Sequence, residues 1–177
     1  MVSTRLSIVA STICAVALSA CGNSEEPKAA APPPEHGIFV SSSDCASTDK
    51  LTIEQCGQAI DQAIAEHNAQ ATVYTSLRLC EAKEGPERCD KIGTNQYRVR
   101  VQAFFVTMSD PPTAVPLYAP HGSTAAFRSP SNQELSVVDE SLKMSRAAMT
   151  IANENSRLPE PNSDGGAGLG AAAADIH

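Results

Sequence analysis

The side chains best suited to chemistry in this 177-residue chain are its six cysteines and four histidines. Within the central stretch, ten and eight residues separate the two local pairs of cysteines, whereas structural zinc ligands usually come in pairs about two to four residues apart. No Cys-x-x-Cys motif is present to lower the pKa of a thiol. We therefore expect disulfides in this stretch, with no metal and no cofactor. Its four cysteines are Cys45, Cys56, Cys80 and Cys89.

We compare two disulfide pairings of these four cysteines, one local and one nested. A local pairing, Cys45 with Cys56 and Cys80 with Cys89, closes two short loops, each stabilising the fold by roughly 3 kcal/mol in the chain-entropy model. A nested pairing, Cys45 with Cys89 and Cys56 with Cys80, would staple a helical hairpin. Its register is poor, because Cys56 lies about 18 Å of helical rise before the hairpin turn and Cys80 only about one turn after it. The sequence favours the local pairing and leaves the nested one open.

No set of residues forms a recognisable catalytic pattern. Glycan hydrolysis uses two spaced carboxylates, and metal-assisted amide cleavage uses grouped histidine and acidic residues. The acidic residues here fall mostly on expected solvated faces, and the histidines are scattered at His36, His67, His121 and His177. We therefore expect no catalytic residues and a protein that is not an enzyme. The alternative is an enzyme, or an enzyme accessory, acting on peptidoglycan or on a thiol or polyamine metabolite. A pocket gathering Glu54, His67 or His121 with Arg98 would favour it.

The N-terminus carries the most specific motif of the chain. Arg5 precedes a short apolar run over residues 6–18, and Leu18-Ser19-Ala20-Cys21 follows. This resembles a bacterial lipobox, and the resemblance implies that residues 1–20 are removed as a signal peptide and that Cys21 carries lipid. The alternatives are a plain secretory signal or an uncleaved anchor, but the apolar run is short for a transmembrane helix. Several acyl chains on one residue would make the membrane a firm partner.

The compartment follows from this motif. Cys14 would leave with the signal peptide, so an even number of cysteines would remain in an oxidising space. Gly22 follows the lipidated cysteine, where, by similarity to enterobacterial sorting rules, an aspartate would favour retention in the inner membrane. For a Gram-negative bacterium we therefore expect the periplasmic face of the outer membrane, with a further envelope protein as a second partner to consider. The net charge of −7 and the lack of a basic cluster argue against nucleic acid.

The domain organisation follows composition. Residues 21–37 are expected to be a flexible lipidated tether, residues 38–155 a single small domain, and residues 156–177 a disordered tail. The fold class we expect is α+β: a small disulfide-stapled helical module over residues 38–90, then a short antiparallel sheet and a C-terminal helix over residues 95–155.

Local patterns place the helices of this module. Thr52 and Gln55 have the spacing of a capping box, which predicts a helix start. A shorter helix is predicted from Ser76 to Glu84, ended by Gly85-Pro86. The apolar positions of the first helix share one face at spacings of three and four; they are Ile53, Cys56, Ile60, Ala63, Ile64 and His67.

The C-terminal half predicts strands and one long helix. Residues 95–108 alternate at period two and predict one strand, with Arg98 and Arg100 on a solvated face. Short strands are expected on either side of His121, which is interpreted as a turn residue. Residues 131–134 form a second capping-box pattern, which predicts a helix running to about Asn155 with an apolar stripe of Leu135, Val138, Leu142 and Met149.

A pattern of residues built around four cysteines spans roughly residues 38–130. Its members are Phe39, Asp44-Cys45, Glu54-x-Cys56, Ala59, Ala63, Tyr74, Cys80-Glu81, Gly85 and Cys89, followed by Pro116-Leu117-Tyr118 and Phe127-Arg128. This pattern resembles the YgiB-type family of uncharacterised proteobacterial lipoproteins. The resemblance implies an envelope lipoprotein with no established activity, so no catalytic residue is carried over. The chain departs from the family in its tail, because family members often end in a long Gly/Gln-rich, methionine-rich segment.

Overall fold

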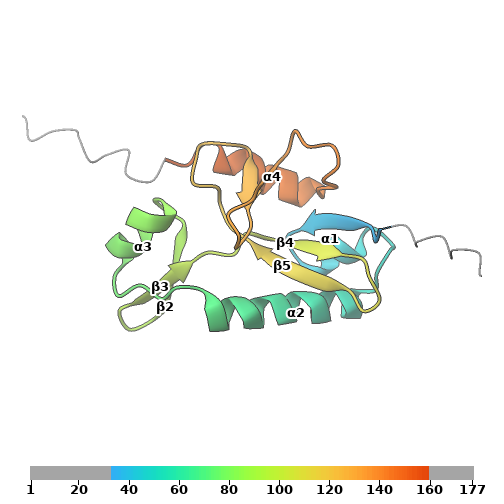
Figure 1. Cartoon of the computed structure of the whole chain (residues 1–177), viewed down its shortest axis with the longest axis horizontal. Helices are drawn as coiled ribbons and strands as arrows, with labels where there is room; N and C mark the ends of the chain where they lie inside the picture. Colours follow the sequence, from blue (N-terminus) through green and yellow to red (C-terminus); the bar gives the residue numbers. More distant parts are fainter. Residues whose placement is uncertain (1–32, 160–177) are drawn as a thin grey trace, which may run out of the picture. The chain divides into compact units, whose positions relative to one another are not determined.

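The computed structural model describes residues 33–159 and shows the predicted α+β fold, with helices packed on small antiparallel sheets (Figure 1). The central sheet has three antiparallel strands in the order β1-β4-β5, and two-stranded sheets pair β2 with β3 and β6 with β7. The strands are β1 His36–Phe39, β2 Cys89–Gly93, β3 Gln96–Val99, β4 Ala103–Thr107, β5 Thr113–Leu117, β6 Ala126–Arg128 and β7 Glu134–Ser136. The helices are α1 Ser42–Ala46, α2 Ile53–Gln70, α3 Leu77–Glu84 and α4 Arg146–Asn155.

Alternation along the strands divides the core into two layers. Phe39 pairs with Phe104 in the register of β1 and β4, and both contribute to a buried cluster with α1 and α2. Their sequence neighbours point to the opposite face, where Ile38 and Ala103 pack with Leu117 against β6, β7 and α4. Figure 1 accordingly shows α2 along one side of the sheet and α4 on the other.

The two predicted helix starts of the cysteine module are confirmed. Thr52 Oγ1 accepts a bond of 3.2 Å from the Gln55 N–H, and the Gln55 side chain accepts one of 2.9 Å from the Thr52 N–H. Ser76 caps α3 in the same region, and Gly85 ends it with a φ of 107° that favours glycine. The buried stripe of α2 is narrower than expected, because Ile53 and Ile64 remain substantially exposed.

The single strand predicted over residues 95–108 is wrong. The chain forms β3, leaves the β2–β3 hairpin, and then forms β4 in the central sheet. Arg100 donates its backbone N–H to the Arg88 carbonyl at 2.8 Å, whereas Gln102 donates to the Leu117 carbonyl at 2.8 Å. The backbone therefore changes its hydrogen-bond partners within two residues. This change depends on tertiary contacts, which the alternation in the sequence does not reveal.

The long helix predicted from residue 131 is also wrong over its first half. Asn132 has a φ of 64°, and the Gln133 N–H donates to Ser129 Oγ at 3.1 Å, so this segment is a tight turn joining β6 to β7. Leu135 then pairs with Phe127 across the hairpin. Only α4 is helical, and it is capped by Ser145. Among the members of the expected stripe, Val138 is 82% exposed.

The folded segment begins slightly before our expected boundary. His36 falls within the tether expected over residues 21–37, but it lies in β1, and its ring stacks on Phe105 with centroids 5.0 Å apart. The predictions for the signal peptide, Cys21, most of the tether and the tail after Pro159 lie outside the described residues. Within residues 33–159, no helix is long and apolar enough to cross a membrane.

Candidate functional site

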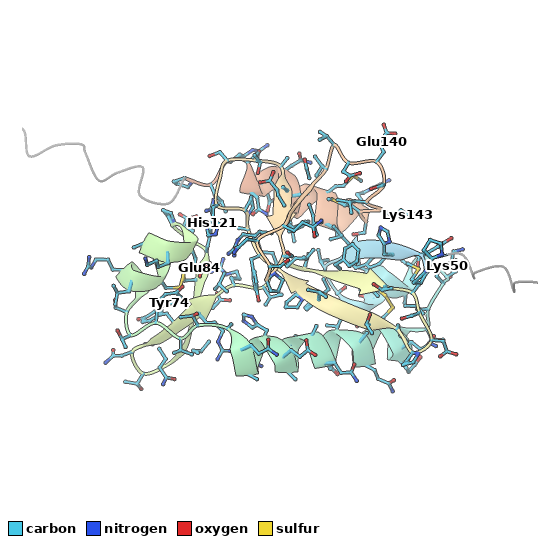
Figure 2. The ribbon with its side chains drawn as sticks, viewed as in Figure 1. Lys50, Tyr74, Glu84, His121, Glu140 and Lys143 are labelled. Carbon is cyan, nitrogen blue, oxygen red and sulfur yellow. A yellow bond between two sulfur atoms is a disulfide. The ribbon has the colours of Figure 1, made fainter. Side chains whose placement is uncertain are left out.

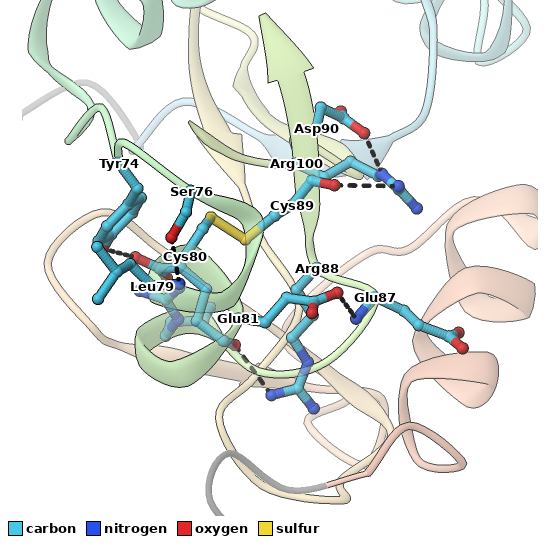
Figure 3. The surroundings of a disulfide bond; sticks show 12 residues. Tyr74, Ser76, Leu79, Cys80, Glu81, Glu87, Arg88, Cys89, Asp90 and Arg100 are labelled. Atoms are coloured by element: carbon cyan, nitrogen blue, oxygen red, sulfur yellow. Dashed lines mark hydrogen bonds and ion pairs between the residues drawn. A yellow bond between two sulfur atoms is a disulfide. The ribbon is translucent and has the colours of Figure 1, made fainter. Parts of the chain in front are cut away.

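Both disulfides have the local pairing that the sequence favoured. Cys45 bonds Cys56 with Cα atoms 6.1 Å apart, which ties α1 to the first turn of α2. Cys80 bonds Cys89 with Cα atoms 6.2 Å apart, which ties α3 to β2 (Figure 3). All four cysteines are buried. Within the described residues, no group of three or more histidine, cysteine or acidic side chains could hold a metal ion.

One surface pocket combines depth with several buried polar side chains. It has a volume of about 420 Å³ and lies among the end of α2, the end of α3, β5 and the start of the β6–β7 turn. Its apolar walls come from Val99, Val115 and Pro116. The polar side chains that line it are Glu66, His67, Gln70, Thr72, Glu84, Tyr118 and Arg128.

His67 is held at this pocket by Tyr118. It lies in the last turn of α2, and its Nδ1 is 3.0 Å from the Tyr118 hydroxyl. Burial lowers the pKa of His67, and the positive charge of Arg98 lowers it further, although Asp90 acts in the opposite direction. The imidazole is therefore neutral near pH 7. Burial, as the largest cause, raises the pKa of Tyr118, so its hydroxyl keeps its proton.

Arg128, at the end of β6, crosses the floor of the pocket. Its Nη2 donates to Glu84 Oε2 at 2.7 Å, its Nη1 to Asn132 Oδ1 at 3.0 Å, and its Nε to the Ala119 carbonyl at 3.4 Å. The guanidinium carbon also lies 5.3 Å from the centroid of the Tyr118 ring. These contacts fix the side chain, which is only 9% exposed.

Glu84, the last residue of α3, connects this helix to the floor of the pocket. Its second carboxylate oxygen accepts a bond of 2.7 Å from the Tyr74 hydroxyl, and Figure 2 shows these two residues together beside α3. Burial, followed by the hydrogen bond and charge of Glu84, raises the pKa of Tyr74 to about 12. The Nη1 of Arg88 donates to the Glu84 carbonyl at 3.1 Å and to the His121 carbonyl at 3.2 Å. Both carboxylate oxygens of Glu84 are thus engaged.

The structure brings some of the sequence-selected residues together and separates others. His67 and Arg98 line a second depression of about 350 Å³, where Arg98 is hydrogen-bonded to Asn68. Glu54 is exposed in the first turn of α2, away from both cavities. His121 is an exposed bend residue, as expected, and lines neither of them.

Sequence reasoning missed the central residues of the pocket, because they are distant along the chain. Glu84 and Arg128 are 44 residues apart, and His67 and Tyr118 are 51 apart. One signal was available: Tyr74, Tyr118 and Arg128 are all residues that carry the family resemblance. Here Tyr74 and Arg128 both donate hydrogen bonds to Glu84, and the Tyr118 ring contacts the Arg128 guanidinium.

Comparison with known proteins gives one match. Residues 34–110 match the model of a family described as "Protein of unknown function (DUF1190)". The matched segment runs from just before β1 to just after β4, so it includes both disulfides but ends before Tyr118 and Arg128. No curated protein and no solved structure matches the chain.

Proposed function

We propose that this chain is a lipid-anchored binding protein of the bacterial cell envelope. The premise is that residues 34–110 belong to the DUF1190 family, which is the YgiB family of uncharacterised proteins. The observation that carries the proposal is the lipobox-like sequence Leu18-Ser19-Ala20-Cys21. A tether would then hold the folded module off the membrane, at the periplasmic face of the outer membrane, where it meets an envelope partner.

The disulfides support this compartment. Every cysteine among residues 33–159 is paired, and bonds of this kind persist in oxidising spaces such as the bacterial periplasm. Cys14 belongs to the segment that processing would remove, so Cys21 is the one cysteine of the mature chain outside the two disulfides. This is the distribution expected when that thiol carries lipid.

The geometry of the pocket favours binding over catalysis. Glu84 is held by Tyr74 and Arg128, and His67 is held by Tyr118. A general acid or base must exchange a proton with the substrate, and Glu84 has both oxygens engaged in bonds within the protein. Rigid polar groups surrounded by apolar walls are suited to fixing the orientation of a bound molecule.

Metabolic labelling with an alkyne-tagged fatty acid tests the anchor. The full-length protein and the Cys14→Ala variant should both incorporate the label, because Cys14 is not the acceptor. The Cys21→Ala variant should incorporate none. Absence of label from the unaltered protein, or retention of label by the Cys21→Ala variant, would contradict lipidation at Cys21.

A second candidate function is an enzyme, or an enzyme accessory, acting on peptidoglycan or on a thiol or polyamine metabolite. The observation in its favour is that His67 and Arg98 line the same depression, which places a neutral imidazole beside a cation. Incubation of the protein with purified peptidoglycan, followed by chromatography of soluble fragments, tests the peptidoglycan branch. Release of fragments that is lost in the His67→Ala variant would support this candidate, whereas no release supports a binding role.

A further inference from the structure

We propose that the pocket formed by α2, α3, β5 and β6 binds the carboxylate of a small organic acid through Arg128 and His67. This site is independent of lipid anchoring, because every residue it uses lies in the folded domain. The proposal rests on hydrogen-bond donors of side chains that line the pocket and have no further partner in the described residues, on the positive charges of Arg128 and Arg98, and on the size and apolar walls of the cavity.

The first donors belong to Arg128. A guanidinium carries five N–H groups, and three N–H contacts of Arg128 are accounted for by Glu84, Asn132 and the Ala119 carbonyl. Two N–H groups remain, one on each terminal nitrogen, on a side chain that lines the cavity. The three existing bonds and the Tyr118 ring hold these donors in place before any ligand arrives, which lowers the entropic cost of binding.

The next donor belongs to His67. The Tyr118 hydroxyl has one hydrogen-bond partner among the described residues, which is His67 Nδ1. A neutral imidazole accepts at one nitrogen and donates at the other. If the Tyr118 hydroxyl donates its proton to Nδ1, its own hydrogen-bonding need is met and Nε2 carries the imidazole proton. Nε2 has no partner within residues 33–159, so His67 offers an N–H donor to a ligand. Gln70 and Thr72 add neutral donors at the rim.

Two cations lie at or near the cavity. Arg128 lines it and pairs with Glu84. Arg98 adds a second positive charge near His67 and Tyr118. Glu66 also lines the cavity, but it is exposed and water screens its charge.

The size and walls of the cavity define the rest of the ligand. About 420 Å³ lies within the range of small-molecule sites. Val99, Val115 and Pro116 would contact the carbon skeleton of the acid, while its two carboxylate oxygens would accept from Arg128 and His67. Hydrogen bonds from charged donors to a carboxylate are stronger than those to a neutral carbonyl, so an acid should bind better than its amide.

Calorimetry and histidine NMR on the full chain in detergent test the proposal with N-acetylalanine, its neutral amide and inorganic phosphate. We expect saturable binding of the acid, binding of the amide weaker by about tenfold or more, and a rise in the pKa of His67 when the acid is bound. The groups facing His67, namely Tyr118, Arg98, Asp90 and Glu66, are the same in both states, so the rise reports the added negative charge.

Variants separate binding from folding. The His67→Gln and Tyr118→Phe variants should each weaken binding of the acid severalfold while the protein stays folded, the second because it frees Nδ1 and no longer fixes the tautomer. The Arg100→Gln variant is the matched control, because Arg100 pairs with Asp90 at an exposed site and does not line the pocket. Equal affinity for acid and amide, no binding at about 10 mM acid, equally tight binding of phosphate, or the same weakening in the control would each overturn the proposal.

Discussion

Breaking the Glu84–Arg128 ion pair from one side should cost far more stability than breaking an exposed pair with the same N–O distance. The two atoms that join Glu84 to Arg128 are 2.7 Å apart, and so are those that join Asp90 to Arg100. The side chains of the first pair are 14% and 9% exposed, whereas those of the second are 50% and 47% exposed. The two ion pairs therefore have the same N–O distance and differ in how deeply their side chains are buried.

Replacing Glu84 by Gln removes the negative charge with little change in shape. Breaking a buried pair from one side typically costs about 3 to 5 kcal/mol, because the remaining charge is left in a medium of low polarity. We expect about 3 kcal/mol, the lower end of the range, since the glutamine oxygen can still accept one bond from Arg128. The Asp90→Asn variant should cost about 1 kcal/mol or less, because water solvates and screens the exposed pair.

Urea unfolding followed by circular dichroism, without reductant, measures both costs. The dependence of the unfolding free energy on urea should be the same in all three proteins, so that the shift in midpoint reports stability alone. Equal destabilisation of the two variants, or a loss below about 1 kcal/mol for Glu84→Gln, would refute the view that this pair is a buried support of the pocket.

Three further predictions concern a tyrosine, a disulfide and a core residue of the folded domain. In an absorbance titration of the tyrosines, the pKa of Tyr74 should fall below about 12 in the Glu84→Gln variant but stay above its ordinary value, because burial, the largest cause of the raised pKa, remains. The stability that this raised pKa confers is present below the ordinary pKa of about 10 and is lost as the pH rises through the folded value. Replacing Cys80 and Cys89 together by alanine should lower the unfolding free energy by about 2.6 kcal/mol in urea, from the nine-residue separation in the chain-entropy model. The Leu117→Ala variant should lose about 2 to 5 kcal/mol in the same assay, since Leu117 is fully buried; a loss under about 1 kcal/mol would place it outside the core.

Features decided within a few residues could be predicted from the sequence. The start of α2 depends on Thr52 and Gln55, each of which accepts a hydrogen bond from the other's backbone N–H. The start of α3 depends on Ser76, whose hydroxyl accepts from the Leu79 N–H. The local disulfide pairing belongs to this class, because each bond closes a short loop beside such a helix. These features depend only on residues that are close in the sequence.

Features that depend on residues far apart in the sequence could not be predicted from the sequence. The pattern at residues 131–134 suits a helix start or a tight turn, and the pairing of Leu135 with Phe127 selects the turn. The polar floor of the pocket is a more extreme case, since Glu84 at the end of α3 and Arg128 at the end of β6 are 44 residues apart in the sequence. A buried ion pair leaves no periodic signal in the sequence, and here the family resemblance at Arg128 was the available indication.

The anchor and both disulfides can be tested together by intact-mass analysis of the protein purified from membranes in detergent, with thiols alkylated before or after reduction. We expect a chain that begins at a triacylated Cys21, with its four remaining cysteines alkylated only after reduction. A chain that begins elsewhere without lipid, or thiols that react without reductant, would contradict the anchored, disulfide-stapled envelope protein proposed here.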